Sequence, residues 1–96
     1  MVQHTVCFKL ADSSDASKEE VRRLLLSMEG KVPSARSISV GVDRLCSERS
    51  YDILLQVLVD DWDALDVYQA DPYHCGTVKA YLRDHAVSTI ALDCEV

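Results

Sequence analysis

The sequence has few basic residues and none of the motifs that bind phosphate. Ten lysine and arginine residues stand against sixteen acidic residues, which gives a formal net charge of −6. A nucleic-acid backbone and an anionic membrane surface both require clustered positive charge. The three glycines form neither a phosphate-binding loop nor a dinucleotide fingerprint. We therefore expect no nucleic-acid partner, no membrane partner and no cofactor.

Long apolar runs and metal-binding cysteine patterns are also missing. No apolar run reaches the roughly 20 residues that a membrane-spanning helix needs, and the first residues lack the pattern of a secretory signal peptide. The four cysteines, at positions 7, 46, 75 and 94, include no Cys-x-x-Cys pair and no zinc-site spacing. The resulting prediction is a cytoplasmic protein with four free thiols and no bound metal.

The composition is that of one small folded domain. The chain has 96 residues, of which 48% are hydrophobic and 27% charged, a mixture typical of globular proteins. Single domains usually contain about 50 to 250 residues. We therefore interpret residues 1–96 as a single domain.

Alternating apolar and polar residues predict four strands. Residues 2–10 alternate without interruption, and residues 37–42, 51–59 and 87–95 follow the same two-residue period. This period is typical of a strand with one face buried against a core. In residues 51–59 the second face is half apolar as well, which indicates that protein covers both sides of the sheet.

Three helices are expected between these strands. Ser17 followed by Glu20 has the spacing of a capping box, and an apolar stripe at helical spacing comes next. The acidic residues Asp60, Asp61 and Asp63 favour a second helix start, because they complement the helix dipole. Asp71 suits an N-cap and Pro72 suits the first helical position of a third helix.

The order β-α-β-β-α-α-β predicts an α+β fold, a ferredoxin-like split βαβ antiparallel sheet with all helices on one face. The other face would carry the partly apolar positions Leu54, Leu58 and Val87. A second copy of the chain is the simplest cover for such a face. We therefore expect two chains to pair sheet to sheet as a homodimeric α+β barrel.

Two histidines are the strongest candidates for chemistry. His4 lies on the helix-facing side of the first strand, and His74 lies on the inward stripe of the last helix, in its first turn. A neutral imidazole, with a pKa near 6.5, removes a proton beside a carbonyl near neutral pH. The helix N-terminus favours a neutral His74, whereas Asp71 opposes this effect, so the sequence leaves the direction of the pKa shift open.

A structural role for both histidines is the alternative. A histidine on an apolar face is often a core residue, and His4 bonding to His74 would satisfy both rings. A ligand site requires a cavity on the order of 300 Å³ between helices and sheet. The structural alternative predicts that apolar side chains fill that space: Leu24, Leu25, Met28, Trp62, Val78 and Leu82.

A metal site built on the two histidines is the less favoured reading. It would need a carboxylate beside them, as in a facial triad. We expect no acidic residue at an inward position on the same elements.

Several segments together resemble the stress-responsive α/β-barrel domain (Dabb) family across essentially the whole chain. The resemblance rests on the opening HTVCFKL with its His-x-x-x-Phe-Lys spacing, the SxEE helix start, and the Tyr-x-x-x-Pro-x-His spacing in YQADPYHCG. It also includes VPSARSISVGVD, RLCSERSYDILLQV and the closing ALDCEV.

The resemblance implies a ferredoxin-like unit that forms a homodimeric barrel. Family members include plant stress-induced proteins, antimicrobial or structural oligomers and an aldol-type polyketide cyclase. In the cyclase-type relatives, residues matching His4, His74 and Tyr68 line the pocket, and the one matching His74 is the catalytic base. A second pocket tyrosine there would fall near residues 24–26, which are leucines here, so this pocket is more apolar.

These observations lead to two functional hypotheses. The first is a small-molecule pocket with polyketide-cyclase- or lyase-like acid/base chemistry on a β-keto or phenolic compound, using His74 as base with His4 and Tyr68 assisting. The second is a non-catalytic stress-response or assembly protein in which the histidines are structural.

Overall fold

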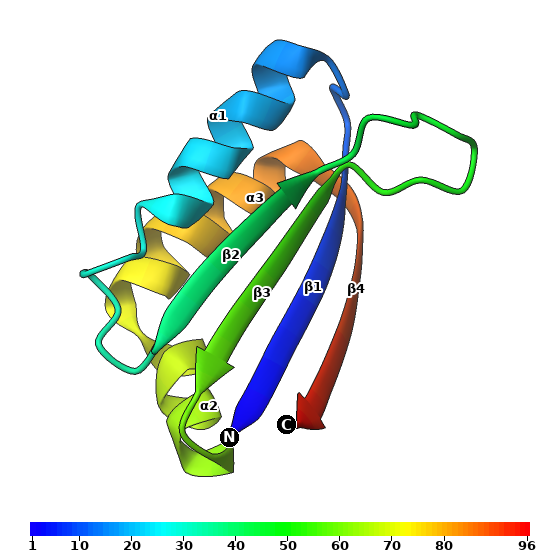
Figure 1. Ribbon diagram of the computed structural model, residues 1–96. Coiled ribbons are helices and arrows are strands. Elements are labelled where there is room, and N and C mark those ends of the chain that lie inside the picture. The colour runs from blue at the N-terminus through cyan, green and yellow to red at the C-terminus, as the bar shows by residue number, and fades with distance from the viewer.

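The computed structural model describes residues 1–96 and shows one antiparallel sheet with every helix on the same face (Figure 1). The strands lie in the order β2-β3-β1-β4. The elements are β1 (Val2–Leu10), α1 (Asp15–Leu26), β2 (Ser37–Val42), β3 (Ile53–Val59), α2 (Trp62–Ala70), the π-helical segment η1 (His74–Lys79), α3 (Ala80–His85) and β4 (Ala86–Glu95). The predicted ferredoxin-like α+β fold is confirmed.

The core lies between the sheet and the helices. Alternate residues of β1 and β3 are buried along their whole length, as the two-residue period predicts. They meet Val21, Leu25 and Met28 from α1 and the turn that follows it, all fully buried. His4 lies on this same buried face of β1, where it pairs with Val57 of β3 and with Asp93 of β4.

Helix α1 begins three residues earlier than the capping box indicates. Ser14 is the N-cap, and its side chain accepts a hydrogen bond from the Ser17 backbone N–H at 3.2 Å. Asp12 in turn accepts from the Ser14 N–H at 3.0 Å, which fixes the turn before the helix. The prediction that Ser17 is the N-cap is therefore wrong, because an earlier serine already satisfies the first free N–H groups.

The caps of the later helices follow the prediction. Asp61 is the N-cap of α2 and accepts from the Ala64 N–H at 2.8 Å. The Asp71 carboxylate accepts from the N–H groups of Tyr73 and His74 at 2.9 and 3.3 Å. Asp71 thus sets the point at which the last helical segment starts, and with it the position of His74.

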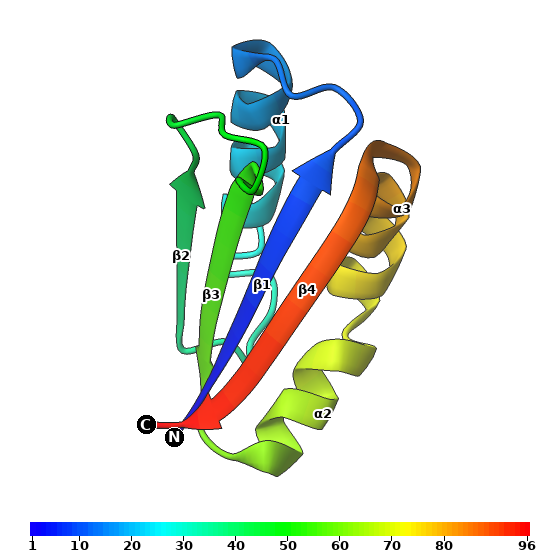
Figure 2. The ribbon, with the colours of Figure 1, turned by 90° about the vertical axis from the view of Figure 1, so that its right-hand side faces the viewer.

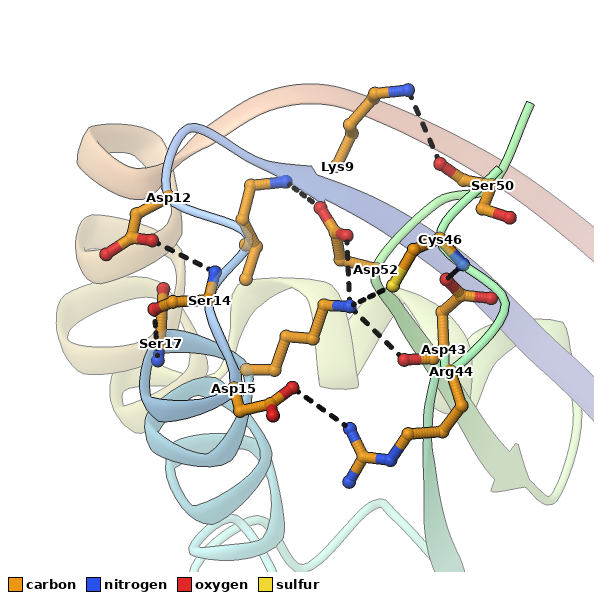
Figure 3. A network of polar contacts seen from close by, with 12 residues as sticks. Lys9, Asp12, Ser14, Asp15, Ser17, Asp43, Arg44, Cys46, Ser50 and Asp52 are labelled. Atoms are coloured by element: carbon orange, nitrogen blue, oxygen red, sulfur yellow. Dashed lines mark hydrogen bonds and ion pairs between the residues drawn. The ribbon is translucent and has the colours of Figure 1, made fainter. Parts of the chain in front are cut away.

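A buried ion pair fastens the loop between β2 and β3 to α1. The Lys18 side chain is 1% exposed, and its Nζ lies 3.2 Å from the Asp43 carbonyl oxygen and 3.7 Å from Asp52 Oδ1. Asp43, Cys46 and Asp52 converge at this point (Figure 3). Asp52 also accepts from the Leu10 N–H at 2.7 Å. Paired in this way, the buried ammonium holds together the end of the sheet far from α2.

The helix-free face carries more apolar surface than expected. The strand register places Leu54 and Leu58 of β3 on this face. It also places Ile90 and Leu92 of β4 there, and Ile90 lies opposite Cys7 of β1. Ile90 and Leu92 are exposed.

Val87 was also expected on this face. It falls at a register shift and has no partner on β1, and the alternation groups it with Thr89 and Ala91, which line the cavity on the opposite face. Strand register therefore does not support the expected position of Val87.

No helix of the protein is long and apolar enough to cross a membrane.

Candidate functional site

A cavity of about 490 Å³ lies between the sheet and the last helical segment, on the side where α3 runs beside β4 (Figure 2). Its volume exceeds the size that a small-molecule site needs. From the sheet it is lined by His4, Val6 and Phe8, among other residues. From the helices it is lined chiefly by His74, Val78, Lys79, Leu82 and Arg83.

The apolar side chains expected to fill this space do not close it. Leu25, Val78 and Leu82 form part of its wall, and Met28 is buried in the core. Trp62 lies on the surface, 46% exposed, and its Nε1–H donates to Glu95 at 3.0 Å. The space therefore remains open to a ligand.

His74 stands at the wall of the cavity at the start of the π-helical segment η1. It is 6% exposed, and its Nδ1 is buried without a hydrogen-bond partner. Buried polar atoms nearly always have partners, so an unpaired one needs an explanation. π-helical turns are also rare and are frequent at functional sites.

Burial keeps His74 neutral. It lowers the pKa of His74 to about 4, and the charges of Lys79 and His4 act in the same direction. Asp71 and the Gln69 backbone carbonyl act in the opposite direction and do not outweigh burial. The sequence left this balance open. At pH 7 the ring is an uncharged imidazole, the form that accepts a proton.

His4 is held by a carboxylate that the sequence analysis missed. Its Nδ1 bonds to Asp93 Oδ1 on the neighbouring strand β4. Because a carboxylate only accepts, Nδ1 of His4 carries the proton. The expectation about acidic residues concerned only the elements that carry the two histidines. Asp93 comes from another strand, β4, whose register with β1 places it directly opposite His4.

A signal for Asp93 existed in the sequence. The alternation of the last strand puts it on one face with Thr89 and Ala91. Recognising its partner requires knowledge that the first and last strands pair, which local alternation does not supply.

Tyr68 joins the two histidines through its ring. The ring centroid lies 5.6 Å from that of His4 and 4.4 Å from that of His74. Its hydroxyl donates to Met28 Sδ at 3.7 Å, and Tyr68 is fully buried and does not line the cavity. Burial, with a smaller effect from Asp71, raises the pKa of Tyr68. The structure thus brings all three predicted residues together, with the phenol directed toward Met28.

His4 and His74 make no hydrogen bond to each other, since His4 is bonded to Asp93 and Nδ1 of His74 is unpaired. No three His, Cys, Asp or Glu side chains are grouped closely enough to hold a metal ion. The four cysteines are free thiols. The chemical groups available in the cavity are therefore two imidazoles and the polar side chains at its edge.

The four-stranded antiparallel sheet with its helices on one face defines a protein of the ferredoxin-like α+β class. Residues 2–96 match the family model of the stress responsive A/B barrel domain (Dabb). The chain belongs to that family.

Several solved structures are similar to this chain in fold. A dimeric protein of unknown function from Bacteroides fragilis is 24% identical, with a TM-score of 0.82, over 99% of this chain and 95% of that one. A dimeric ferredoxin-like protein of unknown function from Thermobifida fusca is 20% identical, with a TM-score of 0.83, over 99% and 90%. A Dabb family protein from Mesorhizobium loti is 18% identical, with a TM-score of 0.72, over 99% and 95%. Comparison with curated proteins finds no match.

Proposed function

We propose that the cavity binds a β-keto or phenolic compound and that His74 acts on it as a general base, in polyketide-cyclase- or lyase-like chemistry. One observation carries the proposal: a buried histidine, neutral at pH 7 and with an unpaired ring nitrogen, stands at the wall of a cavity of about 490 Å³. A neutral imidazole with an unpaired ring nitrogen is the form that accepts a proton from a carbon next to a carbonyl group.

The proposed reaction begins with proton transfer. His74 takes the proton from the carbon between two carbonyl groups, and the electron pair of that C–H bond forms an enolate. The enolate carbon attacks the carbon of a further, more distant carbonyl group of the same molecule. This step forms a C–C bond and leaves an alkoxide. The His74 imidazolium then returns its proton to the alkoxide. No oxidant, metal ion or cofactor takes part in these steps.

His4 is the proposed second contact to the substrate. Its Nδ1 is bonded to Asp93, so Nε2 is the ring nitrogen left to form a hydrogen bond with the bound molecule. The Tyr68 ring, between the two imidazoles, would keep them apart and fix their orientation.

Proton exchange tests the role of His74 directly. In D₂O, the wild type should speed up deuterium incorporation at the α-carbon of ethyl benzoylacetate, as followed by NMR against buffer alone. His74→Gln should reduce the protein-dependent rate by about 100-fold or more, the usual contribution of a general base.

His85→Gln is the matched control for this experiment. His85 is exposed, stacks on Tyr81 and lies outside the cavity. It should leave the exchange rate unchanged. A wild-type rate equal to that of buffer would refute the catalytic proposal and favour a structural role for the histidines.

We also propose that the chain forms a homodimer through its helix-free sheet face. Leu54, Leu58, Ile90 and Leu92 share this face, and a second copy would remove them from water. Two structural neighbours with the same fold are dimeric proteins, which supports this arrangement.

A further inference from the structure

The edge of the cavity is positively charged in a protein that is acidic overall. Lys79 and Arg83 line the cavity, and no aspartate or glutamate does. Neither of these two side chains is among the ion pairs of the protein. With a formal net charge of −6, acidic partners are abundant elsewhere on the chain. Two unpaired cations facing the same cavity therefore call for an explanation.

The π-helical segment brings one of these cations to the same wall as His74. In a π-helix the hydrogen bonds run from residue i to i+5, so Lys79 stands one wide turn after His74. In an α-helix, residue i+5 would lie well around the helix from residue i, because a turn takes 3.6 residues. The proximity of Lys79 is also seen in its contribution to the lowered pKa of His74.

Arg83 continues the row toward solvent. It follows Lys79 by four residues and lies on the same side of the helix, in α3. His74 is buried, whereas Lys79 and Arg83 are exposed. The wall of the cavity therefore changes from a neutral imidazole at its buried part to one ammonium and one guanidinium group at its exposed edge.

We propose that the ligand of this cavity is an amphiphilic anion, an aromatic or β-keto molecule whose carboxylate pairs with Lys79 and Arg83. Its apolar body would lie among Val6, Phe8 and Leu82, which line the inner part. The guanidinium of Arg83 is able to bind a carboxylate through two parallel hydrogen bonds. This inference names the substrate class of the site and rests on the proposed function for what His74 then does to the bound molecule.

A pair of probes that differ only in charge tests the inference. 3-Hydroxy-2-naphthoate and its carboxamide have the same aromatic body, and calorimetry measures the affinity of each. Wild type should bind the carboxylate more tightly than the carboxamide. Lys79→Gln and Arg83→Gln should each weaken carboxylate binding by about two- to fivefold, as expected for partly exposed ion pairs, without changing carboxamide binding.

Arg49→Gln provides the matched control, because it removes one positive charge from an exposed loop residue outside the cavity. It should leave both affinities unchanged. Added salt, at about 0.5 M, should weaken carboxylate binding and leave carboxamide binding as it is.

Three results would overturn the anion inference. They are equal wild-type affinity for the two probes, an equal loss of carboxylate affinity in Arg49→Gln, and no binding of either probe.

The proton-exchange experiment uses a neutral ester and so tests His74 separately. If the protein speeds up deuterium exchange of the ester but binds the carboxylate no more tightly than the carboxamide, the anion inference alone is refuted. If the protein binds the carboxylate more tightly than the carboxamide but does not speed up deuterium exchange of the ester, the catalytic proposal alone is refuted.

Discussion

His74 shows how one buried position sets the charge of a side chain. Burial outweighs the attraction of Asp71 and makes the neutral imidazole the stable form at pH 7. His4 lies on the same cavity but has a carboxylate bonded to it. Two identical side chains thus meet two different environments: the ring of His74 has an unpaired buried nitrogen, and the ring of His4 is bonded to a carboxylate.

The stability of the protein should depend on pH through His74. In the folded protein its pKa is about 4, below the ordinary value of 6.5. The unfolded chain therefore binds the proton more readily, and the free energy of unfolding falls as pH falls from about 6.5 to 4. The full effect is on the order of 3 kcal/mol, because one pKa unit corresponds to about 1.4 kcal/mol.

Urea denaturation at pH 7 and pH 4.5 measures this effect. His74→Gln should lose less stability between the two pH values than the wild type, whereas His85→Gln should lose as much as the wild type. An identical pH dependence in His74→Gln and wild type would show that the folded pKa of His74 is not depressed.

Asp93 should act as a positioning residue for His4. Asp93→Asn keeps the shape of the side chain but removes the charged acceptor that holds Nδ1 of His4. A hydrogen bond to a charged group contributes roughly 1.5–3 kcal/mol, so the exchange rate should fall by about tenfold or more.

The same NMR exchange experiment tests Asp93, with the pH profile of the rate as a second readout. Asp93→Glu should recover part of the rate, because it restores the charge. Equal rates and equal pH profiles in Asp93→Asn and the wild type would mean that the carboxylate does not act through His4.

At the scale of elements, the helix caps place the site. Asp61 starts α2, which carries Tyr68, and Asp71 starts the segment that carries His74. Both caps are aspartates that the sequence marks clearly, since each precedes a run of helical residues. The π-helical form of η1 has no such mark, and nothing in its residues distinguishes it from an ordinary helical turn.

Loss of the N-cap of α2 should destabilise the fold by the amount that a single helix cap contributes. Asp61→Ala removes the acceptor for the Ala64 N–H and should lower the free energy of unfolding by about 1 kcal/mol. Asp66→Ala, an exposed change within the same helix, is the control and should have little effect. Equal urea midpoints for the two variants would contradict the assigned cap.

At the scale of the whole molecule, the two faces of the sheet present different surfaces. One is covered by the helices and contains the cavity, and the other exposes leucine and isoleucine side chains. The proposed dimer assigns the second face to a second copy. The ligand site and the interface would then lie on opposite sides of the same strands.

Leu54→Asp should dissociate this dimer without unfolding the chain. Leu54 lies on the helix-free face, outside the buried core. The substitution should therefore destabilise chiefly the dimer, because it places a charge in the proposed interface. Sedimentation should show a dimer for the wild type and a monomer for the variant. Val67→Asp, at an exposed apolar residue of α2, should remain dimeric. A Leu54→Asp variant that sediments as a dimer at low concentration would exclude this face as the interface.

The sequence by itself determined the strands, their buried faces and the inward position of His4, because alternation is a local property of each strand. It also placed His74 at the start of a helical segment, since Asp71 and Pro72 act on neighbouring residues. Only the tertiary structure decided what these residues meet. Asp93 reaches His4 across 89 residues of sequence, through strand pairing that no local pattern encodes.

The direction of the Tyr68 hydroxyl and the π-helical turn before Lys79 were likewise settled by packing between elements. Each depends on contacts that form when the helices close over the sheet, such as the one between Tyr68 and Met28. Local pattern thus placed His4 and His74 on the inner side of their elements, and packing fixed their partners.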